Sequence, residues 1–335
     1  MLRVFTRLLM FAVLLGGLVL GAGAWWLHSP MTLNLPGGSP VLDLEIEPGT
    51  RAAQVAETVV ASGAQTPVQL LQLWFRVSGQ ARQIKAGSYE ITPGTTPRKL
   101  LTMLVRGDQT LKSITLVEGW SFRQVRDALQ KAELLANDSV GLQAEMIMEK
   151  LGKPGIHPEG RFFPDTYTYA KGSSDMAILK RAAKAMDKRL DTAWALRNPD
   201  TPLKSPEQAL ILASIVEKET GKPSDRGQIA GVFANRLRIG MLLQTDPTVI
   251  YGMGDKFDGN IRKRDLQLDT PYNTYTRGGL PPTPIAMPGK AALMAAVQPA
   301  PTKALYFVAR GDGTSQFSAT LDEHNRAVNK YIRGQ

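Results

Sequence analysis

The sequence predicts an α+β protein with an N-terminal transmembrane helix, a small α/β module and a larger, helix-rich α+β domain. Three observations lead to this prediction. Residues 8–27 contain no charged side chain, and a strand–glycine–threonine–helix pattern then occurs twice. Beyond residue 110 apolar residues recur with the helical period of about 3.6 residues. We therefore expect an anchor over 1–30, a module over 31–109 and a domain over 110–335.

Composition limits the chemistry that the chain can perform. Its 335 residues carry a net charge of +10 and include no cysteine, which excludes disulfides, thiolate nucleophiles and Cys–zinc sites. The three histidines, His28, His157 and His324, are far apart, so a multi-histidine metal site is not expected. The sequence thus predicts no metal and no cofactor, and acid–base chemistry is left mainly to carboxylates. Lys and Arg form no dense block, so nucleic acid is not an expected partner.

The N-terminal run is long enough to cross a membrane. Leu8 to Leu27 are 20 uncharged residues, and a bilayer is spanned by about 20. Arg3 and Arg7 precede the run, which places the N-terminus in the cytoplasm. A cleaved signal peptide with a small-residue site at 22–24 is the alternative, but its apolar region would be only about 7–15 residues long. Either way, everything after the run is exported.

The module is predicted from a repeated frame. Residues 29–40 are typical of a linker or first turn, and the motif E-I-x-P-G-T then occurs at 45–50 and 90–95. Each copy ends a strand at a glycine and offers a Thr or Ser cap to the next helix, expected at 51–62 and 97–106. With a closing strand at 85–91, the frame predicts a strand–helix–helix–strand unit. This unit resembles LysM-type carbohydrate-binding modules, although a generic α/β scaffold has the same pattern.

The third part is predicted to be mostly helical. A weaker copy of the frame at 115–119 leads to a helix over 122–133, and a loop-rich stretch covers 252–290. An Asp-Gly turn at 312–313 favours a hairpin between strands at 305–309 and 316–318. Further helices are expected at 139–151, 174–197, 206–220, 224–239 and 321–332.

One helix carries the strongest candidate for acid–base chemistry. The predicted helix 206–220 has two glutamates near its end, and Glu219 continues its apolar stripe while Glu217 points away from it. A carboxyl in an apolar site loses hydration, which raises its pKa and suits a general acid for glycosidic cleavage. Ion pairing of Glu219 with Arg226 or Arg236 is the alternative.

Other residues near this helix in sequence are candidates for a substrate cleft. Asp246 precedes a proline, so it is either a cleft residue or a helix cap. The loop 272–282 combines aromatic and amide side chains, which suits a saccharide subsite or a purely structural loop. The candidate binding or supporting residues are Glu217, Asn235, Arg236, Gln244, Thr245, Asp246, Tyr272, Asn273 and Tyr275.

Several long motifs in one order identify a family resemblance. The segments 116–119, 159–167, 213–220, 232–241, 243–252 and 272–275 together resemble the endolytic murein transglycosylase family, MltG or YceG-like. The resemblance covers nearly the whole chain, and Arg161 stands where an apolar residue is more usual. It implies an enzyme of the bacterial inner membrane, with one membrane span, a cytoplasmic N-terminus and a periplasmic catalytic domain. Peptidoglycan glycan strands are then the substrate and peptidoglycan synthases the expected partners.

The resemblance also implies a reaction. The enzyme cuts nascent strands internally at the bond between N-acetylmuramic acid and N-acetylglucosamine, without hydrolysis, and leaves 1,6-anhydro-muramoyl ends. The essential glutamate of the family lies in the E-K-E motif, which we assign to Glu219, with Glu217 as the fallback. Two alternatives are a hydrolysing muramidase that uses Asp246 as partner and a non-catalytic, membrane-anchored peptidoglycan-binding protein.

Overall fold

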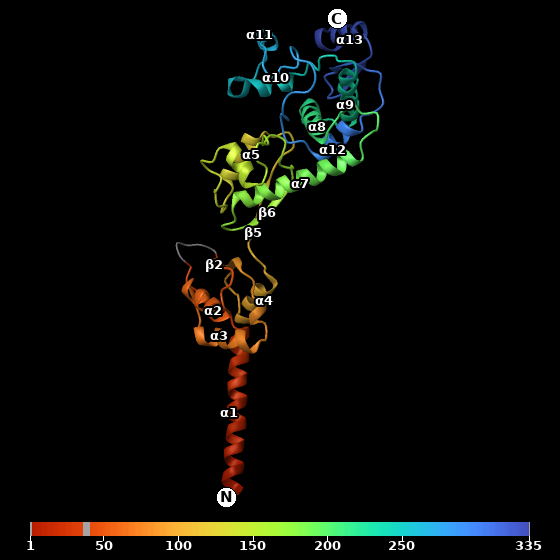
Figure 1. The fold of residues 1–335 in the computed structure, drawn as a ribbon. Helices are drawn as coiled ribbons and strands as arrows, with labels where there is room; N and C mark the ends of the chain where they lie inside the picture. The colour runs from red at the N-terminus through yellow and green to blue at the C-terminus, as the bar shows by residue number, and fades with distance from the viewer. Residues whose placement is uncertain (1, 36–40, 335) are drawn as a thin grey trace. The chain divides into compact units, whose positions relative to one another are not determined.

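The computed structural model describes residues 2–35 and 41–334, and it divides the chain into two compact units (Figure 1). Unit 1 comprises Met1–Lys112 and Thr168–Ser173, and unit 2 comprises Ser113–Tyr167 and Ser174–Gln335. Residues 36–40 of the predicted linker lie outside the described residues.

Unit 1 begins with a single long helix, α1 (Leu2–His28). Its part Leu9–His28 is apolar enough, and at 20 residues long enough, to cross a membrane, and none of it is buried inside the protein. A helix that exposes apolar side chains all around matches an apolar surrounding rather than water. The predicted apolar helix is confirmed, and it is consistent with a single-pass anchor.

The rest of unit 1 has the order strand, helix, helix, strand, but its second helix was not predicted, and the predicted helix 97–106 follows the last strand. Strand β2 (Leu42–Ile46) is followed by α2 (Ala52–Ala61), α3 (Val68–Val77) and β4 (Gly87–Ile91). The two strands pair antiparallel, with Leu42 opposite Ile91. Side chains alternate along β2 between buried and exposed, so one face of the strand covers the core. The remaining elements are β1 (Thr32–Leu33), β3 (Ala64–Gln65), the 3₁₀ turn η2 (Ala81–Gln83) and α4 (Pro97–Arg106). The likeness to LysM modules stays a prediction.

In both copies the N-cap is the residue that follows the frame, and it is a threonine only in the second copy. Thr96 caps α4 by accepting from the backbone N–H of Lys99. In the first copy the N-cap of α2 is Arg51, and the Thr50 hydroxyl instead donates to the carbonyl of Glu47. The predicted cap by Thr50 is therefore wrong, because its hydroxyl is used within the preceding turn.

Unit 2 is helix-rich, as predicted. Strand β5 (Leu111–Thr115) pairs with β6 (Thr166–Ala170), and both run across the division between the units. The hairpin of β7 (Tyr306–Ala309) and β8 (Ser315–Ser318) lies near the C-terminus. The helices are α5 (Phe122–Lys131), α6 (Ala144–Lys150), α7 (Asp175–Ala195), α8 (Pro206–Glu219), α9 (Pro223–Arg238), α10 (Asp246–Met253), α11 (Lys263–Gln267), α12 (Lys290–Val297) and α13 (Leu321–Val328), with a 3₁₀ turn η3 (Gly254–Lys256) and a π-helical turn η4 (Asn329–Arg333).

Helix α8 is at the centre of unit 2. All of its residues from Ala209 to Val216 are buried. Helix α12, which was not predicted from the sequence, packs against α7, α8 and α9. The predicted helix 139–151 begins only at Ala144, because the backbone N–H and hydroxyl of Ser139 are bound to the Asp175 carboxylate at the start of α7.

Candidate active site

Glu219 is the last residue of α8, and its partly buried carboxyl accepts a hydrogen bond from the Thr245 hydroxyl. The pKa of Glu219 is raised to about 7, mainly by burial and to a smaller extent by the charge of Asp246. The Thr245 hydroxyl and the Arg236 charge act in the opposite direction. Desolvation therefore dominates, and the carboxyl is partly protonated near neutral pH.

The Glu219 carboxyl lines a cavity of about 500 Å³, here named the Glu219 cavity. Five predicted site residues, Glu219 included, line this cavity, and a sixth, Thr245, binds the Glu219 carboxyl. The side formed by β7 and α13 was not predicted. The lining residues are Glu219, Arg236, Leu243, Gln244, Asp246, Tyr275, Tyr306, Phe307, Leu321, His324 and Asn325. The lining of the cavity thus includes two carboxyl groups, one buried cation and two tyrosine hydroxyls.

Arg236 is held in place by the backbone around it. Its Nε donates to the carbonyl of Leu305 at 2.7 Å, and its Nη1 donates to the carbonyl of Leu243 at 2.8 Å. The guanidinium lies over the ring of Tyr306, 5.2 Å from its centre. The structure does not pair Glu219 with either arginine that the sequence suggested. Arg236 donates to backbone carbonyls, and Arg226 faces Glu217.

The segment that carries Thr245 is fixed by the loop after α11. Gln244 has a left-handed backbone, with φ of 48°, and its N–H donates to the carbonyl of Thr274. Thr245 is the N-cap residue of α10, so the alternative of Asp246 as the cap is wrong. The Asp246 carboxylate instead accepts from the hydroxyl of Tyr275 at 2.5 Å. These bonds keep Thr245 and Asp246 next to the Glu219 carboxyl.

Glu217 lies outside the Glu219 cavity. Its Oε2 accepts from the backbone N–H of Gly289, the N-cap residue of α12, at 2.8 Å, and its Oε1 is 3.7 Å from Nη2 of Arg226. Its side chain is only 7% exposed. Burial raises its pKa as well. Glu217 joins α8 to α12 and is a supporting residue rather than part of the cavity.

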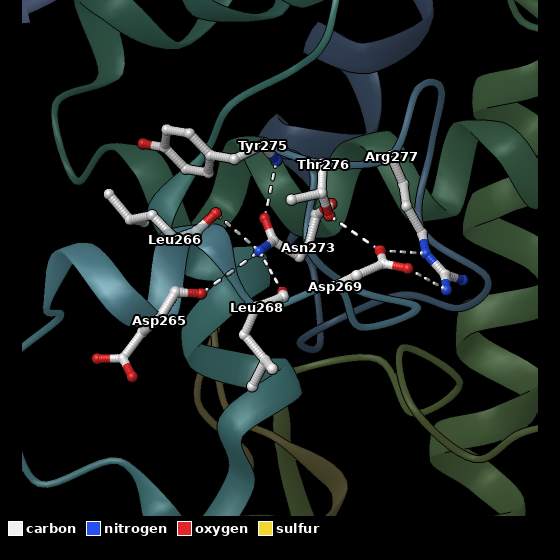
Figure 2. A network of polar contacts seen from close by, with 8 residues as sticks. All are labelled: Asp265, Leu266, Leu268, Asp269, Asn273, Tyr275, Thr276 and Arg277. Carbon is white, nitrogen blue, oxygen red and sulfur yellow. Dashed lines mark hydrogen bonds and ion pairs between the residues drawn. The ribbon is translucent and has the colours of Figure 1, made fainter.

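The two predicted asparagines are used within the protein. Asn235 donates to the carbonyls of Thr302 and Ala304, at 2.9 and 3.0 Å. Figure 2 shows Asn273 at the centre of the loop, where its amide nitrogen points to the carbonyls of Asp265, Leu266 and Leu268 and its oxygen accepts from the N–H of Tyr275. Asn273 therefore positions Tyr275 and does not face the Glu219 cavity.

Tyr272 belongs to a second cavity of about 850 Å³, here named the Glu159 cavity. Glu159 is 3% exposed and accepts from the N–H of Phe122 at 2.9 Å and from the hydroxyl of Tyr251 at 3.1 Å. The rings of Tyr251 and Tyr272 are in contact, with centres 4.9 Å apart. Burial raises the pKa of Glu159 to about 7, and this is the largest of the effects on it.

The two cavities are lined by adjacent residues of unit 2. Lys218 and Pro247 line the Glu159 cavity, and Glu219 and Asp246 line the Glu219 cavity. Glu159 lies in the segment 159–167 of the family resemblance but is not among the predicted site residues. The signal that could have found it is an isolated glutamate before the apolar run of residues 162–164.

Comparison with known proteins relates the chain to one group. The YceG-like family model matches residues 44–330. The chain is 31% identical over 309 residues to the endolytic murein transglycosylase of Bacillus subtilis (strain 168), covering 87% of this chain and 85% of the relative. The endolytic murein transglycosylase of Streptococcus pneumoniae serotype 2 is 27% identical over 289 residues, covering 75% of this chain and 51% of the relative.

A solved structure is also similar. The crystal structure of a putative YceG-like protein from Listeria monocytogenes is 28% identical in sequence and superposes with a TM-score of 0.53. The match covers 85% of this chain and 98% of that chain.

Proposed function

This chain belongs to the YceG-like family, and from that premise we propose that it is a peptidoglycan lytic transglycosylase with Glu219 as its general acid and then its base. The names of its relatives support murein as the substrate. The observation that carries the assignment is the position of Glu219, whose carboxyl lines a cavity and has a pKa of about 7. A general acid works best when its pKa is near the working pH.

The proposed reaction needs a single carboxyl. Protonated Glu219 donates its proton to the glycosidic oxygen, and the bond from that oxygen to C1 of N-acetylmuramic acid breaks. The 6-hydroxyl of the same sugar attacks C1, and the Glu219 carboxylate takes up the hydroxyl proton. The enzyme is thereby returned to its starting state, and the products are a free 4-hydroxyl and a 1,6-anhydro end. No water enters, so a second carboxyl that activates water is not required.

Neighbouring groups suit this chemistry. Positive charge develops on the sugar ring at C1 in the transition state, and the Asp246 carboxylate lies in the same cavity. Its hydrogen bond from Tyr275 fixes its direction. Arg236 supplies a cation that limits the rise of the Glu219 pKa. Thr245 donates to the same carboxyl and holds it in one orientation.

The location follows from α1. We propose that α1 anchors the enzyme by a single pass in the bacterial inner membrane, with Arg3 and Arg7 in the cytoplasm and the chain after α1 outside it. The strand–helix–helix–strand part of unit 1 would then bind glycan as a LysM-like module. Peptidoglycan synthases are the partners that the family resemblance implies.

Product analysis tests the proposal. Full-length enzyme in detergent is incubated with purified glycan strands, and the fragments are identified by mass spectrometry. The expected fragments end in 1,6-anhydro-muramoyl groups, and Glu219→Gln is expected to release none. Reducing ends would instead assign a hydrolysing muramidase, with Asp246 as the partner of Glu219. Activity that survives in Glu219→Gln but is lost in Glu217→Gln would move the acid to Glu217.

A further inference from the structure

Helix α3 has two apolar faces, and only one of them is used inside the protein. Leu71 and Phe75 are fully buried in the core of unit 1. On another side of the helix, Leu70, Leu73 and Val77 are 41%, 54% and 65% exposed. Their spacing of three and four residues places them in one stripe. A soluble module would be expected to carry polar residues there.

The exposed stripe of α3 faces the end of α1. A groove of about 680 Å³ lies between the two helices, and every residue that lines it is apolar or glycine. Leu70, Leu73, Trp74 and Val77 form one wall, and residues between Leu18 and Leu27 form the other. Both helices belong to unit 1. The second half of the candidate membrane span and α3 therefore share one continuous apolar surface.

We propose that α3 is an interfacial membrane helix and that the groove between α1 and α3 binds a lipid acyl chain of the outer leaflet. The inference rests on the proposed insertion of α1, since the residues of α1 that line the groove lie inside its candidate span, Leu9–His28. The α3 stripe lines the same groove as this segment of α1. If acyl chains surround the segment, they also reach the stripe. An amphipathic helix of this kind lies in the plane of the interface.

Polar and aromatic residues around the groove agree with a position of α3 at the membrane interface. Trp25 is 75% exposed at the end of α1, where tryptophan is typical of the interface. Arg98 is hydrogen-bonded to His28, the last residue of α1, at 3.1 Å, and Arg76 is exposed in the last turn of α3. Guanidinium groups at the membrane interface can bind the phosphates of lipid headgroups. The module is thereby held at the membrane surface by two helices instead of one flexible tether.

The absence of cysteine makes a direct test simple, because any introduced cysteine is the only labelling site. Leu73→Cys is labelled with an environment-sensitive fluorophore, and the full chain is placed singly in nanodiscs of phosphatidylethanolamine and phosphatidylglycerol. Nitroxide on the lipid acyl chains then quenches probes that touch lipid. Leu14→Cys, within the span, is the positive control. Glu45→Cys is the matched negative control, since it lies on the outer face of β2 with Asp43, which pairs with Lys171.

The expected result is quenching at Leu73 that is several-fold stronger than at Glu45, and strongest with nitroxide near the headgroup. Equal quenching at Leu73 and Glu45, with Leu14 quenched, overturns the inference and leaves the anchor intact. No quenching at Leu14 overturns the anchor and the inference together. Shielding of Leu73 only when two chains share a disc would assign the groove to a second copy of the chain and overturn the assignment to lipid.

Discussion

Glu219 and Glu159 are two buried carboxyl groups of unit 2 that have the same raised pKa, about 7, for the same main reason, burial. Their surroundings differ. Each oxygen of Glu159 accepts its own donor, a backbone N–H and a tyrosine hydroxyl, and the side chain is almost completely enclosed. Both side chains line a cavity, but Glu219 accepts from one threonine hydroxyl, and its cavity also holds Asp246 and Arg236.

This difference shows that a raised pKa does not identify a general acid on its own. A carboxyl that is enclosed and bonded at both oxygens acts as a structural group, whatever its pKa. An acid catalyst must also reach a substrate atom, and Glu219 meets that requirement better than Glu159 or Glu217. Glu217 has a raised pKa as well, but it is bonded to the N-terminus of α12.

The largest effect is expected for the exchange of each glutamate for glutamine. Glu219→Gln should lower the rate of glycan cleavage by about 10³-fold or more, because glutamine cannot donate or accept the transferred proton. Glu159→Gln and Glu217→Gln should keep the rate within about tenfold of the unchanged enzyme. The rates are measured as anhydro-ended fragments released from purified strands, with thermal unfolding as the control for folding. A loss in Glu159→Gln as large as in Glu219→Gln would remove the distinction between the two sites.

A second effect is expected on stability as a function of pH. The pKa of Glu159 is about 7 in the folded protein and 4.5 as its ordinary value, so the folded state binds the proton more tightly. Stability is then lost as the pH rises from 4.5 to about 7, by up to about 3 kcal/mol. Glutamine stays neutral. Its amide oxygen can accept from the Phe122 N–H and its NH2 can donate to the Tyr251 hydroxyl oxygen, so Glu159→Gln should lose less stability over this range.

Unfolding of the full chain in detergent at about pH 5 and about pH 8 measures this loss. Glu207→Gln is the matched control, because Glu207 is a partly exposed glutamate that is paired with Arg161 and lies outside both cavities. Equal pH dependence in Glu159→Gln and the unchanged protein would show that Glu159 is already ionised in the folded state at low pH.

The same comparison shows which features could be predicted from sequence. Helix α4 was predicted with its observed bounds, Pro97–Arg106, because Thr96, Pro97 and Gly107 give local signals for its start and end. Helix α12 was missed because it packs against α7, α8 and α9 and consists mainly of small apolar residues. A helix that is covered on most sides lacks the polar face that makes a periodic pattern visible.

Only those features of the candidate site that depend on a single helix could be predicted from the sequence. The stripe on α8 predicts different sides of the helix for Glu219 and Glu217, and their different partners agree with this, although Glu217 is buried as well. The partner of Glu217, by contrast, is Gly289, 72 residues further along the chain, and Asn235 is bonded to a carbonyl 69 residues away. Such contacts are set by the packing of the whole unit, so spacing in the sequence cannot indicate them. The side of the Glu219 cavity that β7 and α13 form was missed for the same reason.

A third prediction concerns the structural role of Glu217. Glu217→Ala removes the acceptor of the Gly289 N–H and leaves Arg226 without its carboxylate. The expected loss of unfolding free energy is about 2 kcal/mol, since a buried donor is left unsatisfied. Glu217→Gln keeps an acceptor oxygen and should lose less than half of that. Denaturant unfolding measures both, and the activity per folded molecule should hardly change. A loss of activity without a loss of stability would contradict the supporting role.

The smallest effect is expected for Thr245→Val. This substitution changes the pKa of Glu219 by removing one hydrogen-bond donor. The Thr245 hydroxyl stabilises the charged form of Glu219 and so lowers its pKa. Thr245→Val removes this donor, and the pKa should rise further. Because the general acid must be protonated to start the reaction, the rate falls as the pH rises through about 7 in the unchanged enzyme. In Thr245→Val this fall should move to higher pH by less than about one unit.

The pH–rate profile of glycan cleavage measures this shift, and Thr220→Val is the matched control. Thr220 follows Glu219 directly, but its hydroxyl accepts from the N–H of Lys222 and does not contact the carboxyl. Its profile should therefore keep the position of the unchanged enzyme. A shift of the Thr245→Val profile to lower pH, or the same shift in both variants, would mean that the group with pKa about 7 is not the Glu219 carboxyl. The profile of Glu159→Gln would then show whether the acid is the enclosed glutamate instead.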